Sequence, residues 1–300
     1  MNTLKISNLC KTYTNGVKAL DDVSLEIQNG LFGLLGPNGA GKSSLMRTIA
    51  ALQQPDAGTV LFNGVDIVKD PTYIRKQIGY LPQDFGVYPK ISAIDLLNHL
   101  AILKGLSNKQ ARAKQVEALL DQTNLLAHRN KAVSSFSGGM RQRFGIAQAL
   151  LGDPKIVIAD EPTAGLDPEE RNRFHNLLSE IGEQVIVVLS THIVEDVSNL
   201  CTQMAVMNSG RLLVHGEPQQ FTSELQGATW EKIVCKESLD AYTHLDVISQ
   251  RLYAGRVKIH VKSLVAPGED FQLVTPDLED VYFNVLAMNS PKNQAVCSGN

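Results

Sequence analysis

One stretch of the chain combines glycines, a lysine and serines at a spacing that binds phosphate groups. Residues 36–43, GPNGAGKS, match every fixed position of the pattern GxxxxGK[ST], after a strand-like apolar run and before a helical pattern. Glycine lets backbone N–H groups converge on phosphate oxygens, and a helix N-terminus adds partial positive charge. We expect Lys42 to reach the β- and γ-phosphates of a nucleotide and Ser43 to hold Mg²⁺. The predicted nucleotide contacts of this loop are Gly36, Pro37, Asn38, Gly39, Ala40, Gly41, Lys42, Ser43 and Ser44.

Two adjacent carboxylates end the apolar run IVIAD, which has the pattern of a buried strand. Both side chains can face the phosphate site where the strand ends, although side chains alternate along a strand. Asp160 fits as a second Mg²⁺ ligand, and Glu161 fits as the group that orients or deprotonates the attacking water. The alternative is a solvated acidic pair that caps the following helix.

Three further side chains can complete such a site. His192 follows the apolar run VIVVLST, and Gln83 also follows a strand-like run, so both lie where α/β sheets bind ligands. His192 can donate a hydrogen bond to the γ-phosphate, and Gln83 can reach Mg²⁺ or water. Tyr13 can stack on a base. Each has a plain structural alternative, a surface or packing role.

A second potential phosphate site begins at Ser137, in the stretch FSGGMRQR. Ser137 is a suitable N-cap for a helix with Met140, Phe144, Ala147 and Leu151 on one face, and Gly138 and Gly139 open its N-terminus to an anion. The chain nevertheless has one lysine-containing phosphate loop. One chain thus has two phosphate-binding features and one complete nucleotide motif.

Short strands and two helical stretches must position these residues. Strand patterns flank Asn15-Gly16, Asn63-Gly64 and the Asn-Ser-Gly turn of MAVMNSGRLLVHGEP, all typical of hairpins. ISAIDLLNHLAILKGL and NKQARAKQVEALLDQTNLL have helical spacing, with Ser92 and Ser107 as candidate caps. The order of elements predicts an α/β core with an inserted helical lobe. From about Gln219 we expect a small α+β appendage, with RVKIHVKS as a strand and LEDVYFNVLA as a helix.

Composition narrows the class of protein. The 300 residues are 43% hydrophobic and 20% charged, with a net charge of -3, so no basic field favours nucleic-acid binding. The 4 cysteines are far apart and have no metal-binding spacing, which indicates reduced thiols. No apolar run approaches the ~18 residues of a transmembrane helix, and the start lacks a signal-peptide pattern. We expect a protein of the cytoplasm that reaches a membrane only by binding an embedded partner.

The order of these motifs resembles the ATP-binding cassette of ABC transporters over residues 1 to about 216. The phosphate loop, Gln83, FSGGM, IVIADE, AGLD and STH follow one another as in that family. The resemblance implies a P-loop NTPase fold, with a RecA-like core, an antiparallel β subdomain and a helical subdomain at about 84–151. It implies ATP hydrolysis that drives transport through a membrane permease. The remaining chain is predicted as an accessory domain at 217–288 and a disordered tail at 289–300.

The resemblance also implies roles for individual residues. Tyr13 contacts adenine, Gln83 is the sensing glutamine and a metal contact, and His192 is the switch histidine. Asp160 and Glu161 act on magnesium and water. Asp167 lies in the loop between subunits.

The same resemblance explains the second phosphate feature. It implies that Ser137, Gly138 and Gly139 complete the site of a second cassette, so that two cassettes stack head to tail around two ATP molecules. Phe136 and Met140 replace the leucine and glutamine of the usual LSGGQ, and Gln148 stands where many cassettes have arginine. Neither Met140 nor Gln148 is among the residues expected to take part in hydrolysis.

Three less specific phrases resemble bacterial export-type cassettes for drugs, lipids or antibiotics, in which the permease is a separate chain. They are QDFGVYP, SGGMRQRFGIAQAL and PDLEDVYFNVL. This implies a protein on the cytoplasmic side of the inner membrane, held there by its permease. The residues Phe85, Gly86, Val87 and Tyr88 either transmit motion to a permease helix or pack within the lobe.

Other functions are compatible with parts of the sequence. A non-transport ABC ATPase acting on a ribosome or DNA usually has two fused cassettes or a long coiled-coil insert, and this chain shows one cassette and no heptad run. A regulatory protein with a degenerate site is disfavoured by intact Lys42, Glu161 and His192. A GTPase is disfavoured because NKxD is absent from the sequence and FSGGM would be unexplained.

Overall fold

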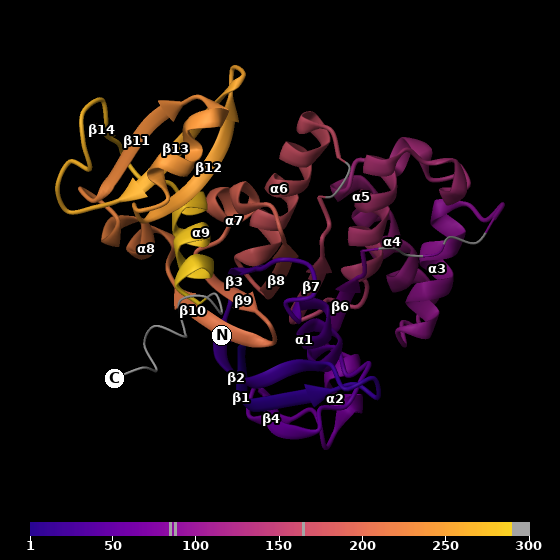
Figure 1. Ribbon diagram of the computed structural model, residues 1–300. Coiled ribbons are helices and arrows are strands. Elements are labelled where there is room, and N and C mark those ends of the chain that lie inside the picture. The colour runs from indigo at the N-terminus through magenta and orange to yellow at the C-terminus, as the bar shows by residue number, and fades with distance from the viewer. Residues whose placement is uncertain (84–85, 87–88, 164–165, 290–300) are drawn as a thin grey trace. The chain divides into compact units, whose positions relative to one another are not determined.

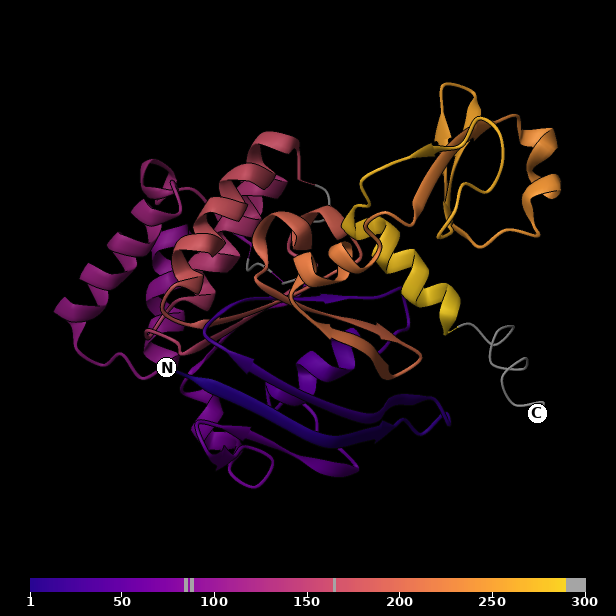
Figure 2. The ribbon, with the colours of Figure 1, turned by 90° about the vertical axis from the view of Figure 1, so that its left-hand side faces the viewer.

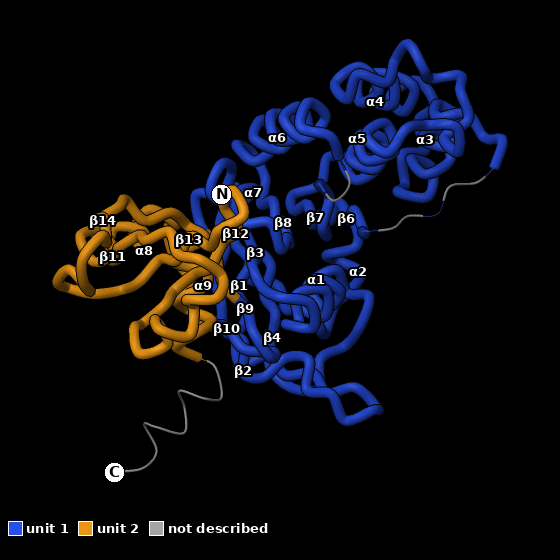
Figure 3. Tube along the Cα trace, turned by 45° about the horizontal axis from the view of Figure 1, so that its top comes forward, with its two compact units in different colours: residues 1–203, 207–212 blue, residues 204–206, 213–300 orange. Residues whose placement is uncertain are grey.

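The computed structural model describes residues 1–83, 86, 89–163 and 166–289, which form two compact units. The first unit contains residues 1–203 and 207–212, and the second contains residues 204–206 and 213–300, as the two colours of Figure 3 show. The boundary between them runs through the strands β9 (Gln203–Asn208) and β10 (Arg211–Gly216).

The first unit begins with an antiparallel sheet of order β2-β1-β4-β5. Its strands are β1 (Thr3–Thr12), β2 (Lys18–Gln28), β4 (Ala57–Phe62) and β5 (Val65–Asp66). The predicted hairpin at Asn63-Gly64 is confirmed, because both residues have positive φ, 49° and 82°, as a two-residue turn requires. The chain between β1 and β2 also turns at Asn15-Gly16, where the Gly16 N–H donates to the Tyr13 carbonyl at 2.9 Å.

Four parallel strands of the first unit place the candidate site at one edge. In spatial order they are β3 (Gly30–Leu35), β8 (Ile186–Thr191), β7 (Ile156–Asp160) and β6 (Ile78–Leu81). The register pairs Leu35 with Thr191 and Asp160 with Ser190, so the carboxyl ends of the central strands meet. Nearly all residues of these strands are buried, and Leu, Ile and Val are their commonest types, as expected of parallel strands covered on both faces.

Helices cover both faces of these strands. The helices α6 (Pro168–Gly182) and α7 (Val194–Leu200) lie on one side, and α1 (Lys42–Ile49) lies on the other (Figures 1 and 2). The short helix α2 (Pro71–Arg75) begins at Asp70, whose side chain accepts from the backbone of Thr72 and Tyr73. The predicted α/β core is therefore confirmed.

The predicted helical stretches form three packed helices, α3 (Ala93–Leu103), α4 (Lys109–Gln122) and α5 (Gly138–Ala149). Short 3₁₀ turns at Leu126–His128 and Val133–Ser135 connect α4 with α5. Ser92 caps α3 as expected, but the prediction of Ser107 as a cap was wrong. Asn108 caps α4 instead, because its amide oxygen reaches the N–H groups of Gln110 and Ala111 at 3.0 Å.

The second unit contains a sheet of order β12-β13-β11-β14. Its strands are β11 (Thr229–Val234), β12 (Val247–Tyr253), β13 (Arg256–Lys262) and β14 (Gln272–Leu273), with the helices α8 (Pro218–Glu224) and α9 (Leu278–Met288) and a 3₁₀ segment at Lys236–Tyr242. The expected strand RVKIHVKS and helix LEDVYFNVLA correspond to β13 and α9. Val257, Ile259 and Val261 bury one face of β13 in an apolar cluster.

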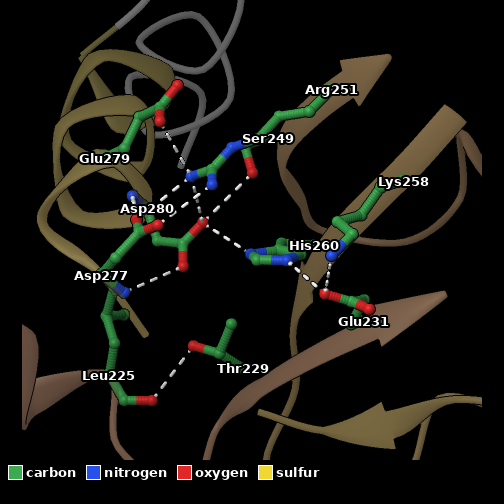
Figure 4. A network of polar contacts seen from close by, with 10 residues as sticks. All are labelled: Leu225, Thr229, Glu231, Ser249, Arg251, Lys258, His260, Asp277, Glu279 and Asp280. Carbon is green, nitrogen blue, oxygen red and sulfur yellow. Dashed lines mark hydrogen bonds and ion pairs between the residues drawn. The ribbon is translucent and has the colours of Figure 1, made fainter. Parts of the chain in front are cut away.

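The other face of β13 carries a polar network around Asp280 (Figure 4). His260 Nδ1 lies 2.7 Å from Asp280 Oδ1, and its Nε2 lies 3.2 Å from Glu231 Oε2. Ser249 also donates to Asp280, at 3.1 Å. The hydrogen bond to Asp280 raises the pKa of His260, whereas burial opposes this rise. The network ties α9 to the sheet.

Candidate nucleotide-binding site

The phosphate loop leaves β3 and turns sharply into α1. Gly39 and Gly41 have φ values of 80° and 105°, in the region that side chains other than glycine rarely adopt. A Cβ atom on Gly41 would also collide with the carbonyl oxygen of Ala19. The Ala40 N–H donates to the Pro37 carbonyl at 3.1 Å, which closes the turn. The glycine requirement of the motif is thus a matter of backbone geometry at this position.

Lys42 lies inside the loop that precedes it. Its Nζ donates to the carbonyl oxygens of Gly36 at 2.6 Å and Pro37 at 3.2 Å. Burial lowers the pKa of Lys42, and the charges of Glu161 and Asp160 act in the opposite direction. The ammonium group therefore lies against the backbone that would surround a phosphate, and the charges of both carboxylates favour its protonated form.

The two carboxylates at the end of β7 have different surroundings. Asp160 is buried and accepts a hydrogen bond from the Ser190 hydroxyl on the neighbouring strand. Glu161 has a φ of 48°, an uncommon conformation for a residue with a side chain, and its N–H donates to the Ser190 carbonyl at 3.0 Å. This bend ends the strand alternation at Glu161, whose side chain lines the pocket in front of the loop.

His192 contacts Glu161 directly. Its Nδ1 lies 3.2 Å from Glu161 Oε2. The histidine side chain is 52% exposed and that of Glu161 is 13% exposed, so the pair spans the pocket from its wall to its opening. His192 immediately follows β8, and the parallel register of β7 and β8 brings the two side chains together.

A pocket of about 490 Å³ joins most of the predicted residues. Gln83, which is exposed just after β6, lies on its wall. The residues that line it are Tyr13, Val17, Ala19, Asn38, Gly39, Ala40, Gly41, Lys42, Ser43, Ser44, Gln83, Glu161 and His192. Residues from five separate segments thus meet at the phosphate loop.

Tyr13 belongs to this pocket through contacts that the sequence did not suggest. Its hydroxyl lies 2.9 Å from Ser44 Oγ and donates to Gln53 Oε1 at 3.0 Å. The sequence analysis missed Gln53, and also Ser190, the partner of Asp160. Ser190 is the first residue of the STH motif, at the end of a strand. That position could have identified it as a residue near the site.

The second predicted phosphate feature does not line this pocket. Ser137 and Gly138 are exposed, and Ser137 Oγ accepts from the Met140 N–H at 3.2 Å, so Ser137 caps α5 as expected. Gly139 is buried against the side chain of Glu170. Asp167 caps α6 by accepting from the Glu170 N–H at 2.8 Å. Of the segment 85–88, only Gly86 lies within the described residues.

The oxygen atoms at the pocket suit a hard cation. Ser43 offers an exposed hydroxyl, and Asp160 and Gln83 offer a carboxylate and an amide oxygen, which are ligand types that Mg²⁺ uses. Within the described ranges, no group of three His, Cys, Asp or Glu side chains could hold a metal ion by itself. A cation here would therefore need oxygen ligands from a bound nucleotide and water, as Mg²⁺ sites with phosphate substrates have.

Comparisons with known proteins identify the family. The family model for ABC transporters matches residues 20–164. The uncharacterized ABC transporter ATP-binding protein YxlF of Bacillus subtilis is 35% identical over 94% of this chain and 99% of its own length. The probable multidrug ABC transporter ATP-binding protein YbhF of Escherichia coli is 31% identical, over 85% of this chain and 46% of its own length.

Two further matches concern transport direction and assembly. The methionine import ATP-binding protein MetN of Lacticaseibacillus paracasei is 37% identical over 78% of this chain and 67% of its own length. The dimeric structure of a post-hydrolysis state of the ATP-binding cassette MJ0796 bound to ADP and Pi has a TM-score of 0.65 and 28% identity, and the match covers 71% of this chain and 98% of that chain.

The chain belongs to the ATP-binding proteins of ABC transporters. It has the cassette fold of the P-loop NTPases, and its family is characterised by ATP hydrolysis. It is the ATP-binding subunit of an ABC transporter, and such subunits pair with membrane permeases and dimerise. In the part of the chain that the structure describes, no helix has the length and apolarity to cross a membrane.

Proposed function

We propose that this subunit hydrolyses ATP at the pocket of the phosphate loop, with Glu161 as the residue that activates water. The observation that carries this proposal is the contact of 3.2 Å between His192 Nδ1 and Glu161 Oε2 at the pocket that Lys42 also lines. In this arrangement Glu161 orients the attacking water and accepts its proton. His192 holds the Glu161 carboxylate in place, and His192 also donates a hydrogen bond to the γ-phosphate.

The remaining polar groups bind and orient the nucleotide. Lys42 and the N–H groups of residues 36–44 bind the phosphates, and the ring of Tyr13 contacts the base. Ser43, Asp160 and Gln83 would hold Mg²⁺, which neutralises charge on the β- and γ-phosphates when it is bound. Ser190 supports this set by donating to Asp160.

We further propose that a second cassette completes each site. Ser137 and Gly138 are exposed at the N-terminus of α5 and do not line the pocket of their own chain, so they are available to an ATP bound by another copy. We propose that Asp167, the N-cap of α6, lies at the same interface. The similarity to a cassette with a dimeric structure supports this assembly.

A groove in the first unit supports the binding of a permease. It has a volume of about 480 Å³, is mainly apolar and is lined by Leu52, Tyr80, Leu100 and Leu103, among others. Leu52 and Leu103 are 61% and 70% exposed at this groove, and an exposed apolar patch is typical of a site that binds a partner. We propose that a permease helix lies here and that the subunit is held at the cytoplasmic side of the cell membrane. Action on a ribosome or DNA is the alternative.

Replacing Glu161 by Gln tests the catalytic assignment. We expect ATP hydrolysis to fall by at least about 100-fold, because the amide cannot accept a proton from water, while the ATP dissociation constant changes little. Hydrolysis is measured by phosphate release, and size-exclusion chromatography with ATP should show a trapped dimer. Glu169→Gln, on the surface of α6, is the matched control.

Adding Ser137→Arg to the Glu161→Gln chain tests the assembly. The added side chain should abolish the ATP-dependent dimer and leave binding of ATP to the monomer intact. Normal hydrolysis by the Glu161→Gln variant would contradict the catalytic role of Glu161. A dimer that survives Ser137→Arg would contradict the shared site.

We propose export of a drug, lipid or similar compound. The export-type sequence phrases support the direction, and the word multidrug in the name of the YbhF relative supports the class of cargo. The test uses inside-out membrane vesicles that contain this subunit and a membrane permease that copurifies with it. ATP added outside should drive a fluorescent lipophilic cation or a labelled lipid into the vesicles, and Glu161→Gln should stop it. ATP-driven loss of probe from preloaded vesicles would show import. Failure to copurify with any membrane protein would favour the alternative function.

A further inference from the structure

The first unit contains a fully buried carboxylate outside the pocket, that of Asp196 on the first turn of α7. It accepts hydrogen bonds from four side chains, and none of them is on its own helix. The partners are Thr163 Oγ1 at 2.6 Å, Arg171 Nε at 2.7 Å, His175 Nε2 at 2.9 Å and Thr191 Oγ1 at 3.4 Å.

The partners of Asp196 belong to the segments that carry the proposed site. Thr163 lies two residues after Glu161, and Thr191 immediately precedes His192. Both hydroxyls bond to the same carboxylate oxygen, Oδ2. One oxygen atom therefore links the segment that holds Glu161 with the segment that holds His192.

The other carboxylate oxygen, Oδ1, links these two segments to α6. Arg171 and His175 are one turn apart on this helix, and its N-cap is Asp167. The Arg171 N–H donates to the Asp167 carbonyl at 2.9 Å. The segments of Glu161, His192 and Asp167 thus converge on one buried side chain.

This arrangement favours a positional role over a purely stabilising one. A buried ion pair costs desolvation, and well-packed apolar side chains would often stabilise a core equally well. Burial by itself would raise the pKa of Asp196, but the hydrogen bonds from His175, Thr163 and Arg171 hold it below its usual value. Asp196 is therefore an ionised acceptor, and its two oxygen atoms orient the donors of three segments.

We propose that Asp196 is a positioning residue for ATP hydrolysis, which holds Glu161 and His192 in register through Thr163 and Thr191 and couples both to the Asp167 end of α6. Asp196 touches neither nucleotide nor metal in this role. The inference rests on the proposed function of Glu161 and His192 and extends it to the side chain that aligns them.

The sharpest test removes one hydroxyl and keeps the side-chain volume. In Thr163→Val the bond to Asp196 is lost, and we expect hydrolysis at saturating ATP to fall about tenfold because Glu161 loses its alignment. The ATP dissociation constant, measured by calorimetry, should change by less than about twofold because the phosphate loop is untouched. Thr163→Ser keeps the hydroxyl and should restore most of the rate.

Thr123→Val is the matched control. Thr123 is equally buried, but its hydroxyl donates to the Leu119 carbonyl within α4, away from the pocket. It should destabilise the fold by a similar amount without lowering the hydrolysis rate. Should Thr163→Val fail to fold, Asp196→Asn serves in its place, with Asn199→Ala, at an exposed position of the same helix, as its control.

The outcomes separate this inference from the proposed function. Equal losses in Thr163→Val and Thr163→Ser, or in Thr163→Val and Thr123→Val, would overturn the positioning role. So would additive losses in the double variant Thr163→Val/Asp196→Asn, because residues that act through one bond should not be additive. If the unaltered chain hydrolyses no ATP, or Glu161→Gln is fully active, the proposed function itself fails.

Discussion

Each of the two units contains one fully buried aspartate that binds a histidine, an arginine and a hydroxyl group. Asp196 has this role in the first unit, and Asp280 has it in the second (Figure 4). Both satisfy the rule that a buried charge must be paired and hydrogen-bonded. The local chemistry of the two clusters is thus nearly the same.

The two clusters differ in what their partners are attached to. Two partners of Asp196 lie beside the nucleotide pocket, since Thr163 is two residues after Glu161 and Thr191 directly precedes His192. The other two, Arg171 and His175, belong to α6. The partners of Asp280 come from β12 and β13, and Asp280 itself takes part in the capping box of α9. With the proposed role of Asp196, similar polar clusters would align a reaction site in one unit and secure a helix on a sheet in the other.

Replacing each aspartate by alanine should affect different properties: Asp280→Ala the stability of the second unit, and Asp196→Ala the rate of ATP hydrolysis. Asp280→Ala leaves Arg251 and His260 without their buried partner and should reduce the free energy of unfolding of the second unit by about 3–5 kcal/mol. Trp230 in β11 is the single tryptophan of the chain, so its fluorescence reports this unit during urea unfolding. ATP hydrolysis should change little.

Asp196→Ala should lower ATP hydrolysis and leave the Trp230 unfolding transition where it is. The proposed difference in role between the two clusters would be contradicted if Asp280→Ala reduced hydrolysis as strongly as Asp196→Ala does. It would also be contradicted if Asp196→Ala shifted the Trp230 transition and Asp280→Ala did not.

The smallest expected effect is a pH dependence confined to the second unit. His260 lies between Asp280 and Glu231, with the cations Arg251 and Lys258 on the same carboxylates, and its folded pKa is raised above the usual value. Because the pKa of His260 is higher in the folded than in the unfolded chain, its protonation stabilises the fold. This contribution is complete at pH values below the unfolded pKa of about 6.5, and it is lost as the pH rises through the folded pKa.

The Trp230 unfolding transition should therefore move to lower urea as pH increases above about 6.5. His260→Gln should remove this dependence, and His244→Gln, at an exposed position, should retain it. A pH dependence that persists in His260→Gln would assign it to another group.

The local features of the fold were predictable because they depend on neighbouring residues. Asn63-Gly64 specifies a tight turn by tolerating positive φ at both positions, and Ser137 specifies the start of α5. Ser107 shows the limit of predicting caps from the sequence. The adjacent Asn108 is an equally good cap by residue type, and only the structure shows that α4 begins directly after Asn108. The predicted roles of Gln83, Asp167 and the Ser137 segment in binding remain predictions.

The sequence by itself determined the cassette family, the phosphate loop, the strand that ends in Asp160, the strand that precedes His192, and the helix that Ser137 caps. These follow from contiguous patterns of glycine, apolar and capping residues. The tertiary structure alone decided that Ser190 supports Asp160, that the bend at Glu161 brings it to His192, and that Asp196 joins three segments. Such contacts depend on the register of parallel strands distant in sequence, and no local pattern encodes that register.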